Sequence, residues 1–291
     1  MARIAWIGAG KMGLPICKRM KAAGHDVRVL ARRPEQAKAL GELGFAVSDT
    51  MPDLIADADI VFTAVSDDQA LHDVVLNNAF RAALSPSATY IDMSTISPAI
   101  SAKIAAHLAG KAYLRSPVSG STGMAEAGTL TALVSGPKQT FNDMADIFAV
   151  FTKKAFHLGE GEEARFLKLA INSMVAATSA LLGEAFAFGL KGGMTHTAML
   201  DVISQSAVAS PLIGYKKDMI ISGDYKPAAT LNMLKKDLDL LLATAQEQHT
   251  HLPVNTMIRD IYAAASHNGL GEKDFFVLVQ EAEKASSAKS K

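Results

Sequence analysis

The chain has 291 residues, 49% of them hydrophobic, and its 29 Lys and Arg residues balance its 29 Asp and Glu residues. This length accommodates one large or two ordinary domains with sizeable cores, and the balanced charge gives no overall attraction to nucleic acid or an acidic membrane. The single Cys17 excludes an intrachain disulfide framework, and the N-terminus lacks the pattern of a secretory leader. We therefore expect a cytoplasmic protein that binds neither nucleic acid nor a membrane.

The first half of the chain alternates short apolar runs with segments long enough for crossover helices. This alternation predicts an α/β domain with a Rossmann-type, doubly wound and mainly parallel sheet over residues 1–160. The runs that predict strands are RIAWIGAG, DVRVLAR, DIVFTAVS, ATYIDMS, KAYLRSPVS, TLTALVSG and KKAFHLG.

After residue 160 the strand pattern ends, and helical periodicity predicts an all-α domain over residues 161–291. Its first helix, at about 161–191, is long enough to join the two domains, and its apolar content all round suggests burial against more than one partner. The apolar character of this domain favours a homodimer or homotetramer. Further helices are expected at 195–207, 211–222, 231–248, 253–267 and 275–284.

A glycine motif, G-x-G-x-x-G, lies between the first predicted strand and the helix that follows it. Gly8 would permit the tight turn, Gly10 would let the backbone approach a pyrophosphate, and Gly13 would let helix and strand pack closely. The helix N-terminus would offer N–H groups and partial positive charge to the phosphates. We also assign to this nicotinamide cofactor site the motif residues Lys11 and Met12, and Val65 and Ser66 at the end of DIVFTAVS.

The end of the second predicted strand bears on the choice of cofactor. NAD sites usually place an acidic residue there to accept from the ribose hydroxyls, but this chain has Ala31 followed by Arg32 and Arg33. Two guanidinium groups can hold a 2′-phosphate and no carboxylate repels it. The residues therefore predict a preference for NADP(H) over NAD(H), the alternative being two solvated arginines.

Lys168 and Asn172 lie four residues apart in FLKLAINSM, inside the long apolar helix, so they share one stripe of it. By itself such a pair indicates a solvated face, since lysine is rarely buried.

Four blocks in order, GAGKMG, DMSTISP, SPVSGSTGMAEAGTL and KLAIN, followed by KKDLDL, resemble the β-hydroxyacid dehydrogenase family over nearly the whole chain. This family includes 3-hydroxyisobutyrate dehydrogenase, tartronate semialdehyde reductase and the glyoxylate/succinic semialdehyde reductases. The resemblance implies an NADP(H)-dependent oxidoreductase that interconverts a small carboxylate-bearing hydroxyacid and its semialdehyde or keto acid.

The resemblance also implies roles for individual residues. Lys168 matches the catalytic lysine, which would protonate the developing alkoxide and would be tuned by partial burial, and Asn172 would hold the lysine or the substrate hydroxyl. Thr95 would lie near the nicotinamide. Substrate would be bound by Lys236, with Asp237 orienting it, and by the turn of Ser119, Gly120 and Ser121.

Three departures from the family pattern leave the substrate open: Arg115, Ser121 and Ser173 stand where the family usually has Asp, Gly and Asn. Arg115 could add positive charge near the pocket or lie on the surface. Two alternatives remain: imine reduction on a related scaffold, which the presence of Lys168 disfavours, and a non-catalytic NADP-binding protein. The scattered histidines, with only His249 and His251 close in sequence, predict no metal site.

Overall fold

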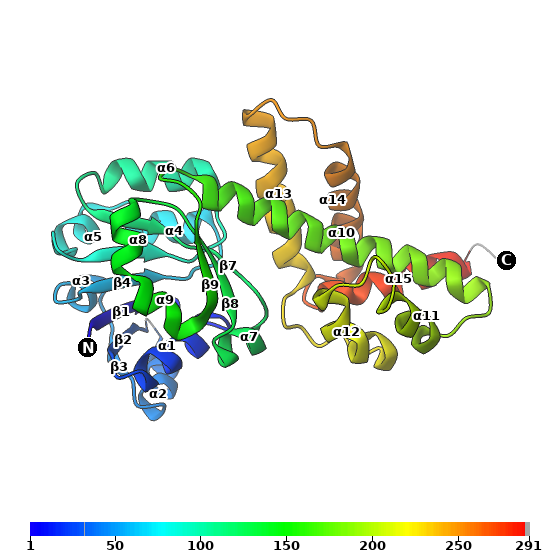
Figure 1. Ribbon diagram of the computed structural model, residues 1–291, viewed down its shortest axis with the longest axis horizontal. Helices are drawn as coiled ribbons and strands as arrows, with labels where there is room; N and C mark the ends of the chain where they lie inside the picture. The colour runs from blue at the N-terminus through cyan, green and yellow to red at the C-terminus, as the bar shows by residue number, and fades with distance from the viewer. Residues whose placement is uncertain (32, 289–291) are drawn as a thin grey trace. The chain divides into compact units, whose positions relative to one another are not determined.

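The computed structural model describes residues 1–31 and 33–288. The chain divides into two compact units, Met1–Lys168 and Leu169–Lys291 (Figure 1). This division falls inside the long helix α10 (Glu163–Lys191), whereas the sequence analysis placed a domain boundary just before that helix.

The first unit contains a six-stranded parallel sheet in the order β3-β2-β1-β4-β5-β6, the arrangement of a doubly wound Rossmann fold. The predicted fold class is therefore confirmed. The strands of this sheet are β1 (Arg3–Ile7), β2 (Asp26–Leu30), β3 (Ala46–Ser48), β4 (Ile60–Thr63), β5 (Thr89–Asp92) and β6 (Ala112–Arg115).

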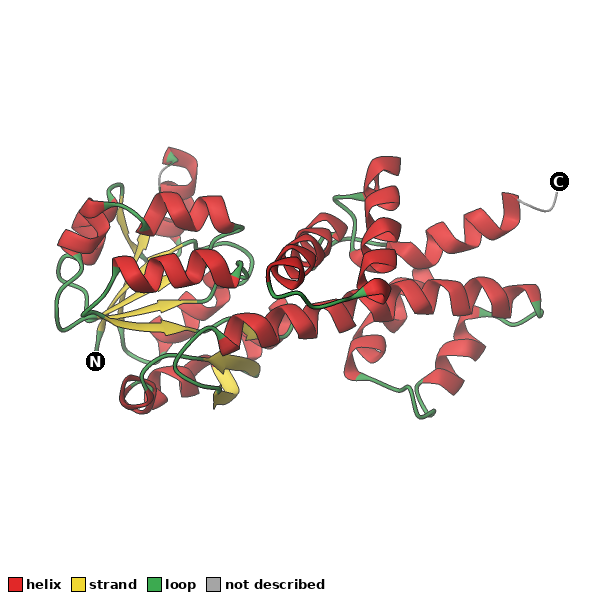
Figure 2. Ribbon diagram, turned by 90° about the horizontal axis from the view of Figure 1, so that it is seen from above, coloured by secondary structure: helices red, strands yellow, loops and turns green. Residues whose placement is uncertain are grey.

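Helices cover both faces of this sheet because alternate strand residues point to opposite sides (Figure 2). Trp6 and Phe62 pack on one face, with α1 (Gly13–Ala22) and α2 (Pro34–Glu42) among its covering elements. Ile7 and Tyr90 belong to the opposite face. That face is covered by α3 (Met51–Ile55), α4 (Asp68–Val75), α5 (Asn78–Ala83) and α6 (Pro98–His107).

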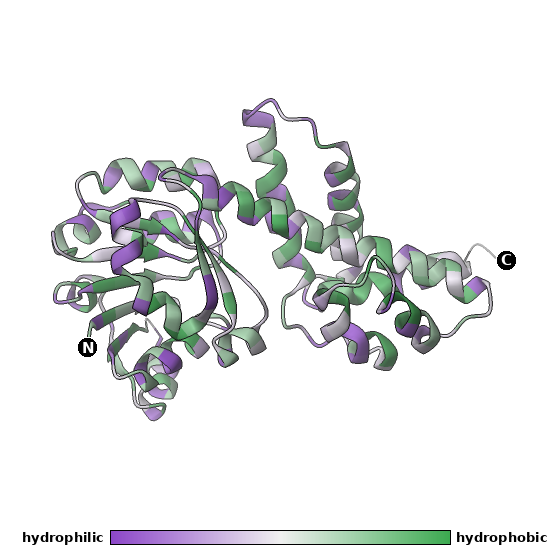
Figure 3. Cartoon of the chain, in the orientation of Figure 1, coloured by the Kyte–Doolittle hydropathy of each residue, from purple (hydrophilic) through white to green (hydrophobic). Residues whose placement is uncertain are grey.

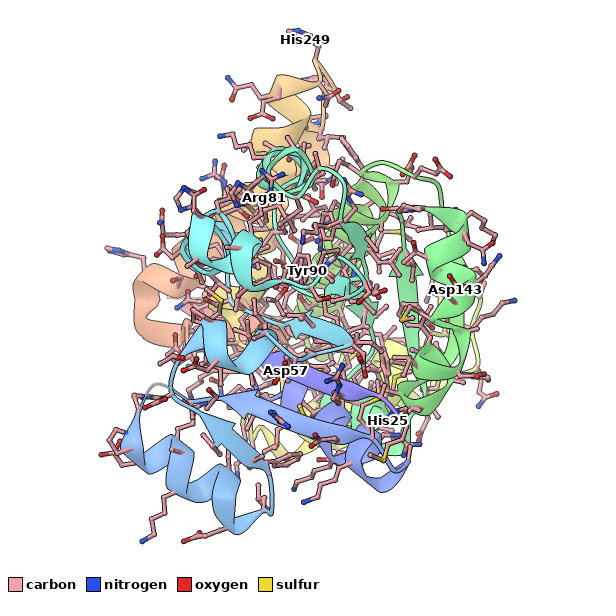
Figure 4. All side chains as sticks on the ribbon, turned by 90° about the vertical axis from the view of Figure 1, so that its left-hand side faces the viewer. His25, Asp57, Arg81, Tyr90, Asp143 and His249 are labelled. Atoms are coloured by element: carbon pink, nitrogen blue, oxygen red, sulfur yellow. The ribbon has the colours of Figure 1, made fainter. Side chains whose placement is uncertain are left out.

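Trp6 stacks on Phe62 with ring centroids 4.7 Å apart, and Cys17 is fully buried in the same cluster. Both are core residues, as their apolar surroundings in the sequence suggest. Figure 4 shows Tyr90 in the interior of the unit.

A second sheet of three strands was not expected as a separate layer. The single predicted strand KAYLRSPVS is two strands, β6 and β7 (Val118–Ser119), which belong to different sheets. Pro117 separates them, and proline cannot donate to a strand ladder. β7 pairs antiparallel with β8 (Leu130–Val134), which pairs parallel with β9 (Thr152–His157), and the connecting helices are α7 (Thr122–Ala127), α8 (Lys138–Asp143) and α9 (Ala145–Phe151).

The described residues of the second unit are helical apart from their connections, with a core that includes Phe186, Tyr262 and Phe276. Its elements after α10 are α11 (His196–Ile203), α12 (Pro211–Ser222), α13 (Leu231–Glu247), α14 (Pro253–Ala265), the turns η1 (Ser266–Leu270) and η2 (Phe275–Val277), and α15 (Leu278–Ala288). α13 and α14 form a hairpin, with His249 at its tip (Figure 4).

Helix α10 is apolar along most of its length (Figure 3), and by length and composition it could cross a membrane, although only 33% of its most apolar window is buried in the chain. Two polar side chains of α10 hydrogen bond to other helices, as expected for a helix in the core of a globular domain. Asn172 hydrogen bonds to Asp237 of α13, and Ser179 hydrogen bonds to Tyr262 of α14. The rest of the surface of α10 is less buried than the apolar composition of this helix suggested.

Candidate active site

The turn after β1 has the geometry of a phosphate-binding loop. Gly8 has φ +96°, and a Cβ there would collide with the carbonyl oxygen of Ala64. A Cβ on Gly13 would collide with the Gly8 carbonyl and lie 2.7 Å from Nε1 of Trp6, so helix and strand pack closely here. At Gly10 a Cβ would meet nothing within 4 Å. Only glycine fits at Gly8 and Gly13, and Gly10 leaves open space beside the N-terminus of α1.

The loops after β4 and β5 are joined by one side chain. The backbone N–H of Val65 donates to Oγ of Ser94 at 3.0 Å, and this hydroxyl donates to Asp92 at 2.7 Å. Val65 and Ser66 therefore lie beside the loop of Ser94 and Thr95, at the carboxyl edge of the sheet where ligands bind in such folds.

The end of β2 places no carboxylate at the position expected to contact the ribose. Ala31 is buried and its N–H donates to the carbonyl of Ser48. Arg33 is exposed directly before α2. The predicted contact from Arg32 lies outside the described residues.

A buried ion pair joins Asp92 at the end of β5 to Arg165 in the first turn of α10. Burial opposes the charge on Arg165, but Asp92 and Tyr113 outweigh it and hold the pKa of the guanidinium above its ordinary value. Burial also raises the pKa values of Tyr90 and Tyr113, the two phenols beside this pair. The network thus holds a charged guanidinium beside two phenol groups that stay neutral.

Arg115 forms a second arginine pair, and the expectation that it could lie on the surface is wrong. Its side chain is buried, donates to Oε1 of Glu162 at 2.9 and 2.5 Å, and stacks 4.6 Å from the ring centroid of Tyr113. Glu162 lies directly before α10. The guanidinium of Arg115 is therefore paired with Glu162 inside the protein, where it holds the start of α10.

The turn of Ser119, Gly120 and Ser121 begins at the last residue of β7, as the sequence indicated. Gly120 is exposed with φ +142°, and Ser119 is half-buried. Ser121 caps α7 by accepting from the N–H of Met124 at 3.3 Å. The hydroxyl that replaces the family's usual glycine thus stabilises the next helix.

Helix α10 carries both Lys168 and Asn172, which are half-buried. Lys168 is the last residue of the first unit, and Asn172 lies in the second. Nδ2 of Asn172 donates to Oδ2 of Asp237 at 2.5 Å, and Nζ of Lys236 lies 2.9 Å from Oδ1 of the same carboxylate. The hydroxyl of Ser173 donates to the carbonyl of Ala170, within its own helix.

Asp92 and Arg165 were not singled out from the sequence, and Asp237 was assigned to Lys236 alone. A signal for Arg165 was present, since an arginine in the first turn of an apolar helix needs a partner if it is buried. Its partner Asp92 is 73 residues away in the sequence, so no local pattern could identify the pair.

These groups fit a nicotinamide dinucleotide: the open space at Gly10 and the helix start suit its pyrophosphate. Within the described residues, no three His, Cys, Asp or Glu side chains are grouped as a metal site would need.

Both parts of the chain match known family models. Residues 3–159 match the NAD binding domain of 6-phosphogluconate dehydrogenase, and residues 162–282 match a model described as NAD-binding of NADP-dependent 3-hydroxyisobutyrate dehydrogenase.

Relatives matched over more than nine-tenths of this chain include a dehydrogenase and a reductase. The chain is 30% identical to L-threonate dehydrogenase of Cupriavidus necator, over 93% of each chain. It is 28% identical to glyoxylate/succinic semialdehyde reductase 2 of Arabidopsis thaliana, over 98% of this chain and 80% of the relative. It spans about half the length of other relatives, 49% in the case of the cytokine-like nuclear factor N-PAC of Anopheles gambiae.

The solved structure of Mycobacterium tuberculosis 3-hydroxyisobutyrate dehydrogenase with L-serine superposes with a TM-score of 0.87 at 26% identity, covering 97% of this chain and 99% of that one. The chain therefore belongs to the β-hydroxyacid dehydrogenase family of NAD(P)-dependent oxidoreductases.

Proposed function

We propose that the protein uses NADP(H) to interconvert a small carboxylate-bearing hydroxyacid and its semialdehyde or keto acid. The observation that carries this proposal is the position of Arg165. Arg165 lies one turn before Lys168 on α10 and donates to the carbonyl of Ser94, the residue before Thr95. The turn of helix with the proposed acid is thus tied to the loop with the proposed nicotinamide contact.

Lys168 is the proposed proton donor and acceptor. When bound, the reduced cofactor supplies a hydride to the carbonyl carbon of the substrate, and negative charge develops on the carbonyl oxygen. The ammonium of Lys168 would stabilise this oxygen and donate the proton that makes it a hydroxyl. In the direction of oxidation the neutral amine would accept that proton.

The remaining proposed contacts orient the substrate. The half-buried hydroxyl of Ser119 and the backbone N–H groups around Gly120 suit a carboxylate. Asn172 and Lys236 share the carboxylate of Asp237, which limits where their N–H groups can point. Because Ser121 caps α7, its contribution to substrate binding would be through the backbone rather than through a free hydroxyl.

The NADP(H) preference rests on the absence of a carboxylate at Ala31 and on the exposed Arg33. A charged hydrogen bond contributes roughly 1.5–3 kcal/mol, which corresponds to a preference of about 10- to 100-fold. Equal kcat/KM with NADPH and NADH would refute this part of the proposal.

The experiment that tests the function is oxidation of NADPH by the wild-type protein with glyoxylate, succinic semialdehyde, methylmalonate semialdehyde and tartronate semialdehyde, beside a cyclic imine. Saturable turnover of at least one of the acids supports the proposal. Turnover of the imine alone would identify an imine reductase, and tight NADPH binding without any turnover would identify a non-catalytic binding protein.

We also propose that the chain forms a homodimer or homotetramer through α10. Met174, Leu181 and Phe188 recur every seven residues on this helix, with exposed fractions of 70%, 64% and 84%. Large apolar groups at heptad spacing form the seam of paired helices. Leu181→Lys is expected to lower the mass measured by light scattering to that of the monomer, whereas Lys191→Ala on the same helix leaves it unchanged; a wild-type monomer would contradict the proposal.

A further inference from the structure

The guanidinium of Arg165 connects four elements of the first unit. It is 1% exposed, and its three nitrogens all donate. Nε donates to Oγ of Ser101 in α6 at 3.2 Å, and Nη1 donates to the carbonyl of Ser94 after β5 at 2.7 Å. Nη2 donates to Asp92 of β5 and to the hydroxyl of Tyr113 in β6. One side chain of α10 is thus bonded to two strands, a helix and a loop.

The partner carboxylate extends this network to the loop after β4. Asp92 is fully buried, and its Oδ1 accepts from Oγ1 of Thr63 at 2.6 Å and from Oγ of Ser94 at 2.7 Å. The hydroxyl of Ser94 also accepts from the N–H of Val65. The loop after β4 and the loop after β5 are therefore both held in place relative to Arg165.

The start of α10 has two further attachments to the same unit. Arg115 holds Glu162, and Oγ of Ser135 donates to the carbonyl of Gly161 at 2.7 Å while accepting from the N–H of Ala164. These contacts fix the chain just before the helix, and Arg165 fixes the first turn itself.

We propose that Arg165 is a positioning residue for the reaction, in that it sets the place of Lys168 relative to the Ser94–Thr95 loop. This inference rests on the proposed function. Residues three apart on a helix are neighbours, so a shift of the backbone at Arg165 displaces Lys168. A misplacement of about 1 Å can lower the rate of a chemical step roughly 100-fold.

Lysine cannot replace the arginine in this role. The guanidinium is a rigid fork with five N–H donors, and four hydrogen bonds at Arg165 diverge to different elements. A lysine would keep the charge beside Asp92, but its single nitrogen would not reach all four acceptors.

Arg165→Lys is therefore the test, and Lys216→Arg is its matched control. Lys216 forms a buried pair with Asp274 in the second unit, at 2.5 Å, so this variant makes the reverse exchange away from the proposed acid. For Arg165→Lys we expect kcat to fall about 100-fold, little change in KM for NADPH, and a larger deuterium isotope effect on kcat with labelled NADPH. For Lys216→Arg we expect wild-type values of all three.

Amide hydrogen exchange of the apo protein gives a second readout. Arg165→Lys is expected to speed exchange in peptides that cover 92–97 and 163–168, and Lys216→Arg is expected not to. If both variants lose the same thermal stability and Arg165→Lys keeps the wild-type kcat and isotope effect, the arginine is merely structural and the inference is overturned.

Milder variants decide the question if Arg165→Lys does not fold. Ser101→Ala and Tyr113→Phe each remove one hydrogen-bond acceptor from the guanidinium. We expect each to lower kcat and raise the isotope effect without changing the Kd for NADPH; wild-type values in both would overturn the inference. Absence of turnover by the wild-type protein would refute the proposed function itself, and this inference with it.

Discussion

In the first unit, the candidate cofactor groups lie on loops at the carboxyl edge of a parallel sheet, where glycine backbone and the network of Asp92 and Arg165 hold them. In the second unit, Asn172 and Lys236 lie on two different helices and meet at one carboxylate, Asp237. The comparison shows two ways to build a site. The loops at the sheet edge depend on glycines and on the network of Asp92 and Arg165, so small changes of the backbone should damage ligand binding there. The candidate groups on the helices of the second unit should depend on one side chain, that of Asp237.

The backbone-built part is best tested at Gly8. Gly8→Ala adds a Cβ that collides with the Ala64 carbonyl and displaces the N–H groups of the turn. Because each lost charged hydrogen bond to the pyrophosphate costs roughly 1.5–3 kcal/mol, we expect NADPH binding, measured by fluorescence titration, to weaken about 100-fold. Gly24→Ala is the control, because Gly24 has a similar φ of +87° but a Cβ there meets nothing within 4 Å. Its expected effect is a stability loss of about 1 kcal/mol with unchanged NADPH binding. Equal binding by both variants would remove the glycine turn from the cofactor site.

The helical part is tested at Asp237. Asp237→Ala releases Asn172 and Lys236 together, and since a charged hydrogen bond contributes roughly 1.5–3 kcal/mol, kcat/KM for the best acid substrate should fall about 10- to 100-fold. Asp239→Ala, which removes an exposed partner of Lys235 on the same helix, should leave this value unchanged. The same loss in both variants would show that α13 matters only for folding.

Alkaline pH should lower the folding stability of both units, because both contain tyrosines with raised pKa values. Burial raises the pKa of all five tyrosines, that of Tyr225 to about 12. Above pH 10 the unfolded chain therefore binds fewer tyrosine protons than the folded one, so stability is full below pH 10 and falls as the pH rises toward the folded values.

The expected slope is about −1.4 kcal/mol per pH unit for each of the buried tyrosines Tyr90, Tyr113, Tyr225 and Tyr262, and smaller for Tyr215, which is 54% exposed. Urea unfolding between pH 9 and 11.5 measures it, and Tyr262→Phe should make the slope shallower. Tyrosine absorbance that changes near pH 10 in the still folded protein would contradict this account.

Much of the fold followed from sequence patterns because buried parallel strands are short apolar runs. β3 was missed for the opposite reason, since Ala46 and Val47 are exposed at the sheet edge and form no such run. The helical unit was predicted well where capping residues mark the ends: α12 starts after the N-cap Ser210 with Pro211, and it covers the predicted residues 211–222.

The candidate site was predictable where a motif is local. The glycine turn, Thr95, Lys168 and Asn172 belong to contiguous blocks, so the family resemblance located them without a structure. The pairs Arg165–Asp92, Arg115–Glu162 and Asn172–Asp237 each join distant parts of the chain, and only the fold brings them together.

The most direct test of the central claim compares Lys168→Ala with Lys191→Ala, a lysine at the other end of the same helix. NADPH oxidation is measured with the best acid substrate of the wild-type protein, beside the Kd for NADPH. The account predicts that Lys168→Ala loses about 10²- to 10⁴-fold in kcat, the range of general acid catalysis, while its Kd for NADPH and the kcat of Lys191→Ala stay at the wild-type values. A Lys168→Ala protein that keeps the wild-type kcat would contradict it.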